Sequence, residues 1–107
     1  MSIISEITSL YDSVPRRHTT DNVKDIYGII EQYEDILIQI ESINPFYEKN
    51  IGSYFDAALN AKAAIKKSTD SKASKKNKDA FFDDGSGILK ENMQHLIEWF
   101  EDGKRDQ

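Results

Sequence analysis

The stretch Thr20 to Ile43, TDNVKDIYGIIEQYEDILIQIESI, decides the fold. Its apolar residues are spaced three and four apart and the pattern repeats every seven residues, which predicts a long amphipathic helix. These residues are Val23, Ile26, Ile29, Ile30, Tyr33, Ile36, Leu37, Ile40 and Ile43. On a helical wheel they cover an arc of roughly 160°, wider than the stripe that meets a single neighbour. We therefore expect this helix to pack against two or more others.

A shorter amphipathic helix is predicted before it, over about 2–14. Pro15 ends that helix because proline disfavours helical geometry in the residue that precedes it. Thr20 and Asp21 favour the start of the helix over 20–43, since a side-chain oxygen and a carboxylate both stabilise the free N–H groups of a helix.

Two more helices are predicted in the rest of the chain. Asn44 and Pro45 indicate a tight turn and the first position of a helix over 45–67. Segment 68–86 is lysine-rich, then glycine-containing, and lacks apolar periodicity, so we expect a flexible loop. The last helix is predicted over 87–102. The fold class is all-α: an antiparallel up-and-down bundle of three to four helices, with a central helical hairpin and one long polar loop.

Composition limits the possible classes of protein. A chain of 107 residues is enough for one domain with one core. It contains no cysteine, which excludes disulfides, thiol catalysis and thiolate metal sites. The longest aliphatic run, 36–38, is far shorter than the roughly 20 apolar residues that span a bilayer. The start, MSIISEITSL, has no basic region typical of a secretory signal. A cytoplasmic location is expected, with leaderless export left open.

Charge is distributed unevenly along the chain. Residues 1–61 carry four Lys and Arg against ten Asp and Glu, residues 62–78 carry seven Lys against one Asp, and residues 79–107 carry three against eight. The acidic majority argues against binding to duplex nucleic acid, because Lys and Arg supply most of the affinity for phosphates. Two interpretations of the basic segment remain, a solvated linker or a site for nucleic acid or an anionic surface. The residues of that second interpretation are Lys66, Lys67, Lys72, Lys75, Lys76 and Lys78.

No pattern of residues indicates an enzyme. His18 and His95 are the only histidines, and neither lies in a recognisable catalytic motif. His95 lies one helical turn from Glu91, an ordinary arrangement for a partly exposed histidine beside a carboxylate. Paired Glu-x-x-His motifs, which bind iron in helical bundles, are absent. We expect no catalytic residues, no metal site and no cofactor.

The segment DAFFDDGSGILKE partly resembles the spacing of a calcium-binding loop. Asp84, Gly85 and Glu91 fall at the fifth, sixth and twelfth positions of such a loop. Ala80 and Phe82 then occupy two positions that require oxygen ligands. The sequence therefore favours an acidic turn in front of a helix.

Several apolar residues lie outside the predicted core. On the wheel, Tyr27 and Ile38 fall on the same side as Glu31 and Glu34, which predicts a contact patch ringed by carboxylates. Phe81 and Phe82 either anchor the long loop to the bundle or contact a partner. The predicted partner-binding set is Tyr27, Glu31, Glu34, Ile38, Phe81, Phe82 and Trp99.

These features favour a non-enzymatic protein–protein interaction module: a small acidic helical adaptor, accessory or inhibitor-type protein that binds another protein. The alternative function is binding of nucleic acid or an anionic surface through 62–78. A homodimer is a further alternative, because a second copy could complete the wide apolar arc of the helix over 20–43.

Overall fold

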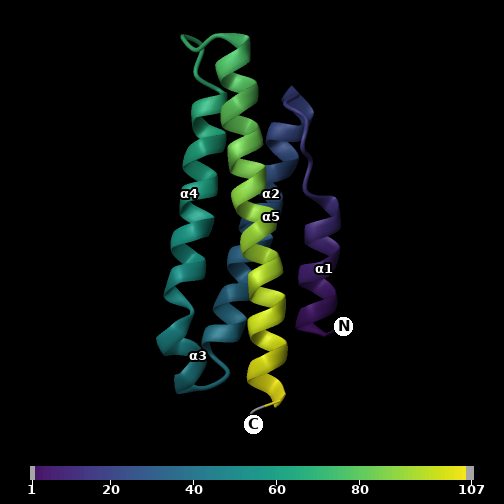
Figure 1. Ribbon diagram of the computed structural model, residues 1–107, viewed down its shortest axis with the longest axis vertical. Helices are drawn as coiled ribbons and strands as arrows, with labels where there is room; N and C mark the ends of the chain where they lie inside the picture. Colours follow the sequence, from purple (N-terminus) through teal and green to yellow (C-terminus); the bar gives the residue numbers. More distant parts are fainter. Residues whose placement is uncertain (1, 106–107) are drawn as a thin grey trace.

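The computed structural model describes residues 2–105, with side chains for residues 2–100. This part of the chain forms five helices and no strand, which confirms the prediction of an all-helical fold (Figure 1). In the same residues, no helix is both long and apolar enough to cross a membrane. The helices are α1 (Ile3–Ser13), α2 (Thr20–Glu41), α3 (Pro45–Asn50), α4 (Gly52–Ser68) and α5 (Lys75–Arg105).

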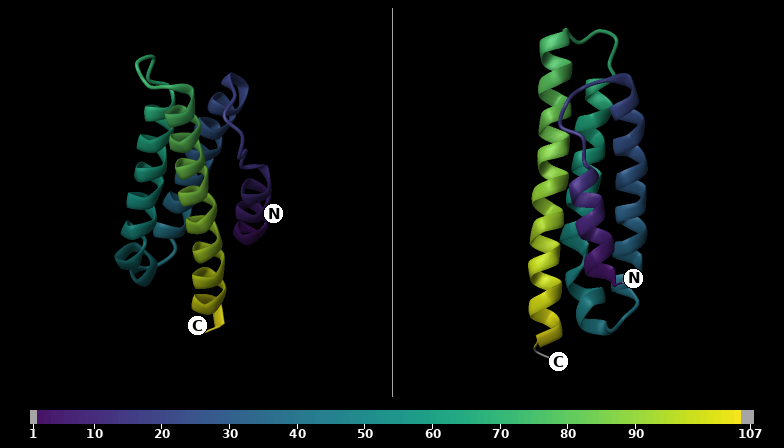
Figure 2. Two further views of the ribbon diagram at one scale, coloured as in Figure 1. Left: turned by 45° about the horizontal axis from the view of Figure 1, so that its top comes forward. Right: turned by 90° about the vertical axis from the view of Figure 1, so that its right-hand side faces the viewer.

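α1, α2, α4 and α5 lie along the long axis of a body measuring 49 × 24 × 17 Å, and the short α3 lies at one end of it (Figure 1). α1 and α4 run in one direction along this axis, and α2 and α5 run in the other (Figure 2). α5 packs mainly against α4 and also against α1, whereas α2 packs against α1, α3 and α4. α1 has only 11 residues and α5 has 31, so α1 packs beside only part of α5. The connection 14–19 leads from the end of α1 to the start of α2 and contacts the first half of α5 through Arg16 and His18 (Figure 2).

The apolar arc of α2 forms the centre of the core. Seven of its residues are buried, at positions 26, 29, 30, 33, 36, 37 and 40. Val23 is partly buried and packs against the core, whereas Ile43 lies beyond the end of α2 and is exposed. Helices of the same chain cover the buried arc, so the arc provides no argument for a second copy.

The predicted helix over 45–67 is divided at Ile51. Asn44 caps α3 as predicted, because its side chain accepts a hydrogen bond from the Tyr47 N–H at 3.0 Å, and Pro45 occupies the first turn. The Ile51 side chain is buried, and Gly52, a poor helix former, begins α4. The start of α2 also differs by one residue, since the side chain of Thr19, not that of Thr20, accepts the hydrogen bond from the Asn22 N–H.

The largest difference from the sequence prediction is in segment 68–86. We predicted a long flexible loop there, but α5 already begins at Lys75, and the connection between α4 and α5 is only 69–74. The three-and-four spacing in fact continues backwards from Leu89 through Ser86 to Phe82, and all three residues are buried. The sequence analysis missed this pattern because Ser86 is polar and does not count as an apolar position. Its hydroxyl donates to the Phe82 carbonyl at 3.0 Å, so its burial leaves no donor unpaired.

A partly buried hydrogen bond joins α2 to α5. The Tyr33 hydroxyl donates to Oδ1 of Asn92, and the Tyr33 side chain is fully buried. Burial raises the pKa of Tyr33, and the nearby Tyr54 raises it further. The folded-state pKa therefore lies above the unfolded value near 10. This hydroxyl stabilises the fold fully below pH 10, and its contribution is lost as the pH rises above that value.

Replacing Tyr33 with phenylalanine should lower the free energy of unfolding by about 1–2 kcal/mol, because Asn92 would lose its partner in a partly buried position. Tyr47→Phe is the matched comparison, since the Tyr47 hydroxyl is buried and has no hydrogen-bond partner in the described part of the chain. That change should leave stability equal or higher. Urea unfolding followed by circular dichroism measures both. Equal losses of stability in the two variants would contradict a stabilising role for the hydrogen bond between Tyr33 and Asn92.

Candidate interaction surfaces

The outer face of α2 and α4 carries the predicted apolar patch. The Lys62 ammonium donates to the Glu34 carboxylate across the two helices at 3.2 Å, which fixes their relative position. Ile38 lies one turn beyond Glu34, and Leu59 lies one turn before Lys62. Since the helices run in opposite directions, both residues are on the same side of this ion pair. Their side chains are 55% and 54% exposed.

The remaining predicted members of this patch differ in exposure. Glu31 is exposed and Glu34 is partly buried, whereas Tyr27 is half-buried and packs against the core. The sequence analysis did not include Leu59 in this patch. Glu34, Glu41 and Asp56 are carboxylates that lie three or four residues from Ile38 or Leu59 on the same helices.

Phe81 and Phe82 have different environments. Phe82 is fully buried, 5.5 Å from the ring of His18 between ring centroids. It is a core residue in this structure and presents no surface to a partner. Phe81 is half-buried, and the Lys67 ammonium lies 5.8 Å from the centre of its ring. The two adjacent phenylalanines therefore take separate roles because successive residues on a helix point about 100° apart.

Trp99 belongs to an aromatic cluster at the end of the bundle where α3 lies. Its ring centroid is 5.2 Å from that of Tyr47, 5.3 Å from that of Tyr54 and 6.1 Å from that of Phe46. Trp99 is half-buried, and Phe46 is the outermost ring, 52% exposed. The cluster joins the short α3 to α4 and α5.

The six lysines of the basic segment lie on ordered structure. Lys66 and Lys67 are in the last turn of α4, Lys72 is in the connection, and the other three are at the start of α5. Arg16, Arg17 and His18 line the same hollow as Lys75, although they are almost 60 residues away from it in sequence. Arg16 pairs with Asp83 at 2.9 Å, and Nδ1 of His18 lies 3.0 Å from the Asp79 carboxylate. No local pattern in the sequence indicates these long-range pairs.

His95 and Glu91 form an exposed pair on α5. Nε2 of His95 lies 3.7 Å from the Glu91 carboxylate, and both side chains are largely in solvent. In the part of the chain described, no group of three or more His, Asp or Glu residues could hold a metal ion. Asp84, Gly85 and Glu91 lie on one continuous helix, which does not form the loop that calcium binding requires.

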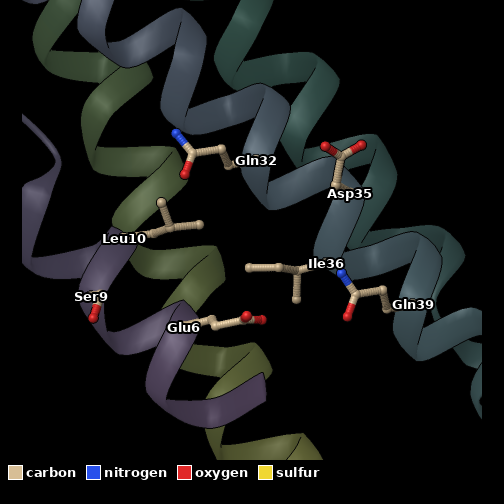
Figure 3. A pocket seen from close by; sticks show the side chains of 7 residues that line it. All are labelled: Glu6, Ser9, Leu10, Gln32, Asp35, Ile36 and Gln39. Carbon is tan, nitrogen blue, oxygen red and sulfur yellow. The ribbon is translucent and has the colours of Figure 1, made fainter. Parts of the chain in front are cut away.

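A shallow hollow of about 320 Å³ lies between α1 and α2. Figure 3 shows Leu10 and Ile36 pointing toward one another at its centre, with polar side chains around them. Glu6 and Asp35 are its charged groups, and it has no histidine, lysine or arginine. Sequence reasoning had not singled out this hollow.

Comparison of the chain with protein-family models, with curated proteins and with solved structures finds no match.

Proposed function

We propose that this chain is an antiparallel up-and-down helical bundle that acts as a non-enzymatic protein-interaction module. Its contact surface is the outer face of α2 and α4, centred on Ile38 and Leu59. This proposal rests on one observation: Ile38 and Leu59 are large aliphatic residues on adjacent helices, and each has more than half of its surface exposed. Protein interfaces have such apolar centres surrounded by polar groups.

The charged groups around the two aliphatic residues indicate the chemistry of the partner. Glu34, Glu41 and Asp56 each lie about one helical turn from Ile38 or Leu59. A complementary partner therefore presents an apolar cavity bordered by Lys or Arg. The carboxylates contribute mainly to the association rate and to partner discrimination, and this contribution weakens as salt increases.

The test is affinity capture with the intact chain and two variants. Ile38→Ser combined with Leu59→Ser should reduce capture of the partner by about tenfold or more, because hot-spot residues each contribute on the order of 2 kcal/mol. Ile43→Ser is the matched control, since Ile43 is similarly exposed but lies in the turn after α2. It should leave capture unchanged.

Light scattering at several protein concentrations tests whether the partner is a second copy. A dimer that the double substitution converts to a monomer identifies a second copy as the partner. Capture of the same proteins by the wild type and by the double variant, together with an unchanged oligomeric state, contradicts the proposal.

A further inference from the structure

Positive charge gathers at one end of the bundle, where α2 begins and α4 connects to α5. Segments 15–25 and 66–79 carry nine Lys and Arg against four Asp, whereas the rest of the chain carries five against fifteen. The fold brings these two distant segments together at one end of the bundle. Two arginines thereby join the lysine segment, and arginine binds phosphate oxygens through two parallel hydrogen bonds.

Two hollows open beside His18 at this end. The first, of about 470 Å³, is lined by Arg16, Arg17, His18, Thr19, Lys75 and Asp79. The second, of about 330 Å³, also has His18 on its wall and is lined by Lys24 and Lys78. Both volumes fall within the range of small-molecule sites, roughly 300–1,000 Å³. A ligand that occupies both hollows would contact positive groups from the connection 14–19, α2 and α5.

Most of these positive groups lack an acidic partner. Among residues 2–100, Arg16 pairs with Asp83, but no carboxylate pairs with Arg17, Lys24, Lys75 or Lys78. Side-chain hydroxyls already occupy the helix ends, because Thr19 accepts from the Asn22 N–H and Ser74 accepts from the Asn77 N–H. The unpaired side chains are therefore available to bind an anion. Their mutual repulsion decreases when an anion neutralises them.

We propose that these two hollows bind a condensed phosphate, either a free polyphosphate chain or the polyphosphate part of a nucleotide. Such a ligand concentrates several negative charges in a volume that fits the hollows. No large apolar side chain is exposed at this end in the described part of the chain, and Phe81 is half-buried beneath Lys67. Stacking on bases, the usual contact to single-stranded nucleic acid, therefore has no platform. The site is separate from the α2–α4 face, so the two proposals fail independently.

Calorimetric titration with sodium tripolyphosphate tests the site. Arg17→Gln combined with Lys75→Gln should weaken binding by about tenfold or more, because both side chains line the first hollow. Lys72→Gln combined with Lys76→Gln is the matched control. It removes the same charge from the same end, but neither lysine lines either hollow. The control should weaken binding about threefold or less. Lys72 and Lys76 attract the anion only from a distance, through solvent in which salt screens the charges.

The thermal midpoint of both double variants should be equal to or higher than that of the wild type, because the substituted side chains form no ion pair in the described structure and their removal lowers the repulsion between like charges. A parallel titration with ATP distinguishes the two sources of the phosphate chain. Equal affinity for ATP and tripolyphosphate indicates that the site recognises the phosphate chain alone. Tighter binding of ATP indicates that the natural ligand is a nucleotide. Equal weakening by the two double variants overturns the proposal. So does binding of phosphatidylserine vesicles or a 20-nucleotide DNA strand in the absence of tripolyphosphate binding.

Discussion

Replacing Phe82 with alanine should lower the free energy of unfolding by about 3–5 kcal/mol, the largest effect expected of any single substitution discussed for this chain. The Phe82 side chain is fully buried and packs near His18 beneath the connection 14–19. Phe82 belongs to the buried core cluster, and the packed side chains around a deleted ring relax only partly, so a cavity remains. Guanidinium or urea unfolding, followed by circular dichroism, measures the loss.

Phe81→Ala is the matched control for Phe82→Ala. It removes the same atoms from the adjacent position, but Phe81 is half-buried and its ring contacts the Lys67 side chain. We expect a loss of about 1 kcal/mol, from partial burial and the contact with the ammonium group. Similar losses for the two variants would show that Phe82 is not a core residue.

Replacing Gly85 with alanine should destabilise the protein by about 1–3 kcal/mol, although alanine is normally the better helix former. A Cβ atom at position 85 would lie 2.6 Å from Cδ1 of Ile65 and 3.0 Å from the backbone oxygen of Ala61. The Ile65 side chain is itself fully buried, so it cannot rotate away freely. α4 and α5 would have to separate, which would disturb the most extensive helix pair in the structure.

Gly87→Ala is the matched control, since Gly87 lies on the same helix and a Cβ atom there would meet nothing within 4 Å. This change should stabilise the protein by up to about 1 kcal/mol, because it lowers the backbone entropy of the unfolded chain. The prediction is therefore a difference in sign between two neighbouring glycines. Stabilisation by both substitutions would contradict a close approach of α4 and α5 at Gly85.

The parts of the fold that the sequence predicts are those set by local pattern. α2 follows from its own apolar spacing, and α3 begins at Asn44 and Pro45 because capping is a local interaction. The first half of α5 was missed because its glycines and Ser86 are typical of a loop. Gly85 is required there by two residues on another helix, Ile65 and Ala61, and no local pattern indicates these contacts.

In the candidate surfaces, too, the sequence predicts what a local pattern defines and misses what depends on contacts between helices. Ile38 and its carboxylate neighbours could be placed on one side of α2 from a helical wheel alone. Leu59 joins them only through the alignment of α2 with α4, which the Glu34–Lys62 pair marks. Likewise, the lysines of 66–78 were visible as a run, but their proximity to Arg16 and Arg17 depends on the path of the connection 14–19.

The connection 14–19 determines how solvent can reach the core near Phe82. Segment 14–19 covers Phe82 with a single extended strip of chain, which is held by the buried Val14 and by the side-chain pairs Arg16–Asp83 and His18–Asp79. Few amide hydrogen bonds fasten this strip, unlike the helices beneath it. Lifting of this strip would therefore admit solvent to the core while every helix remains wound.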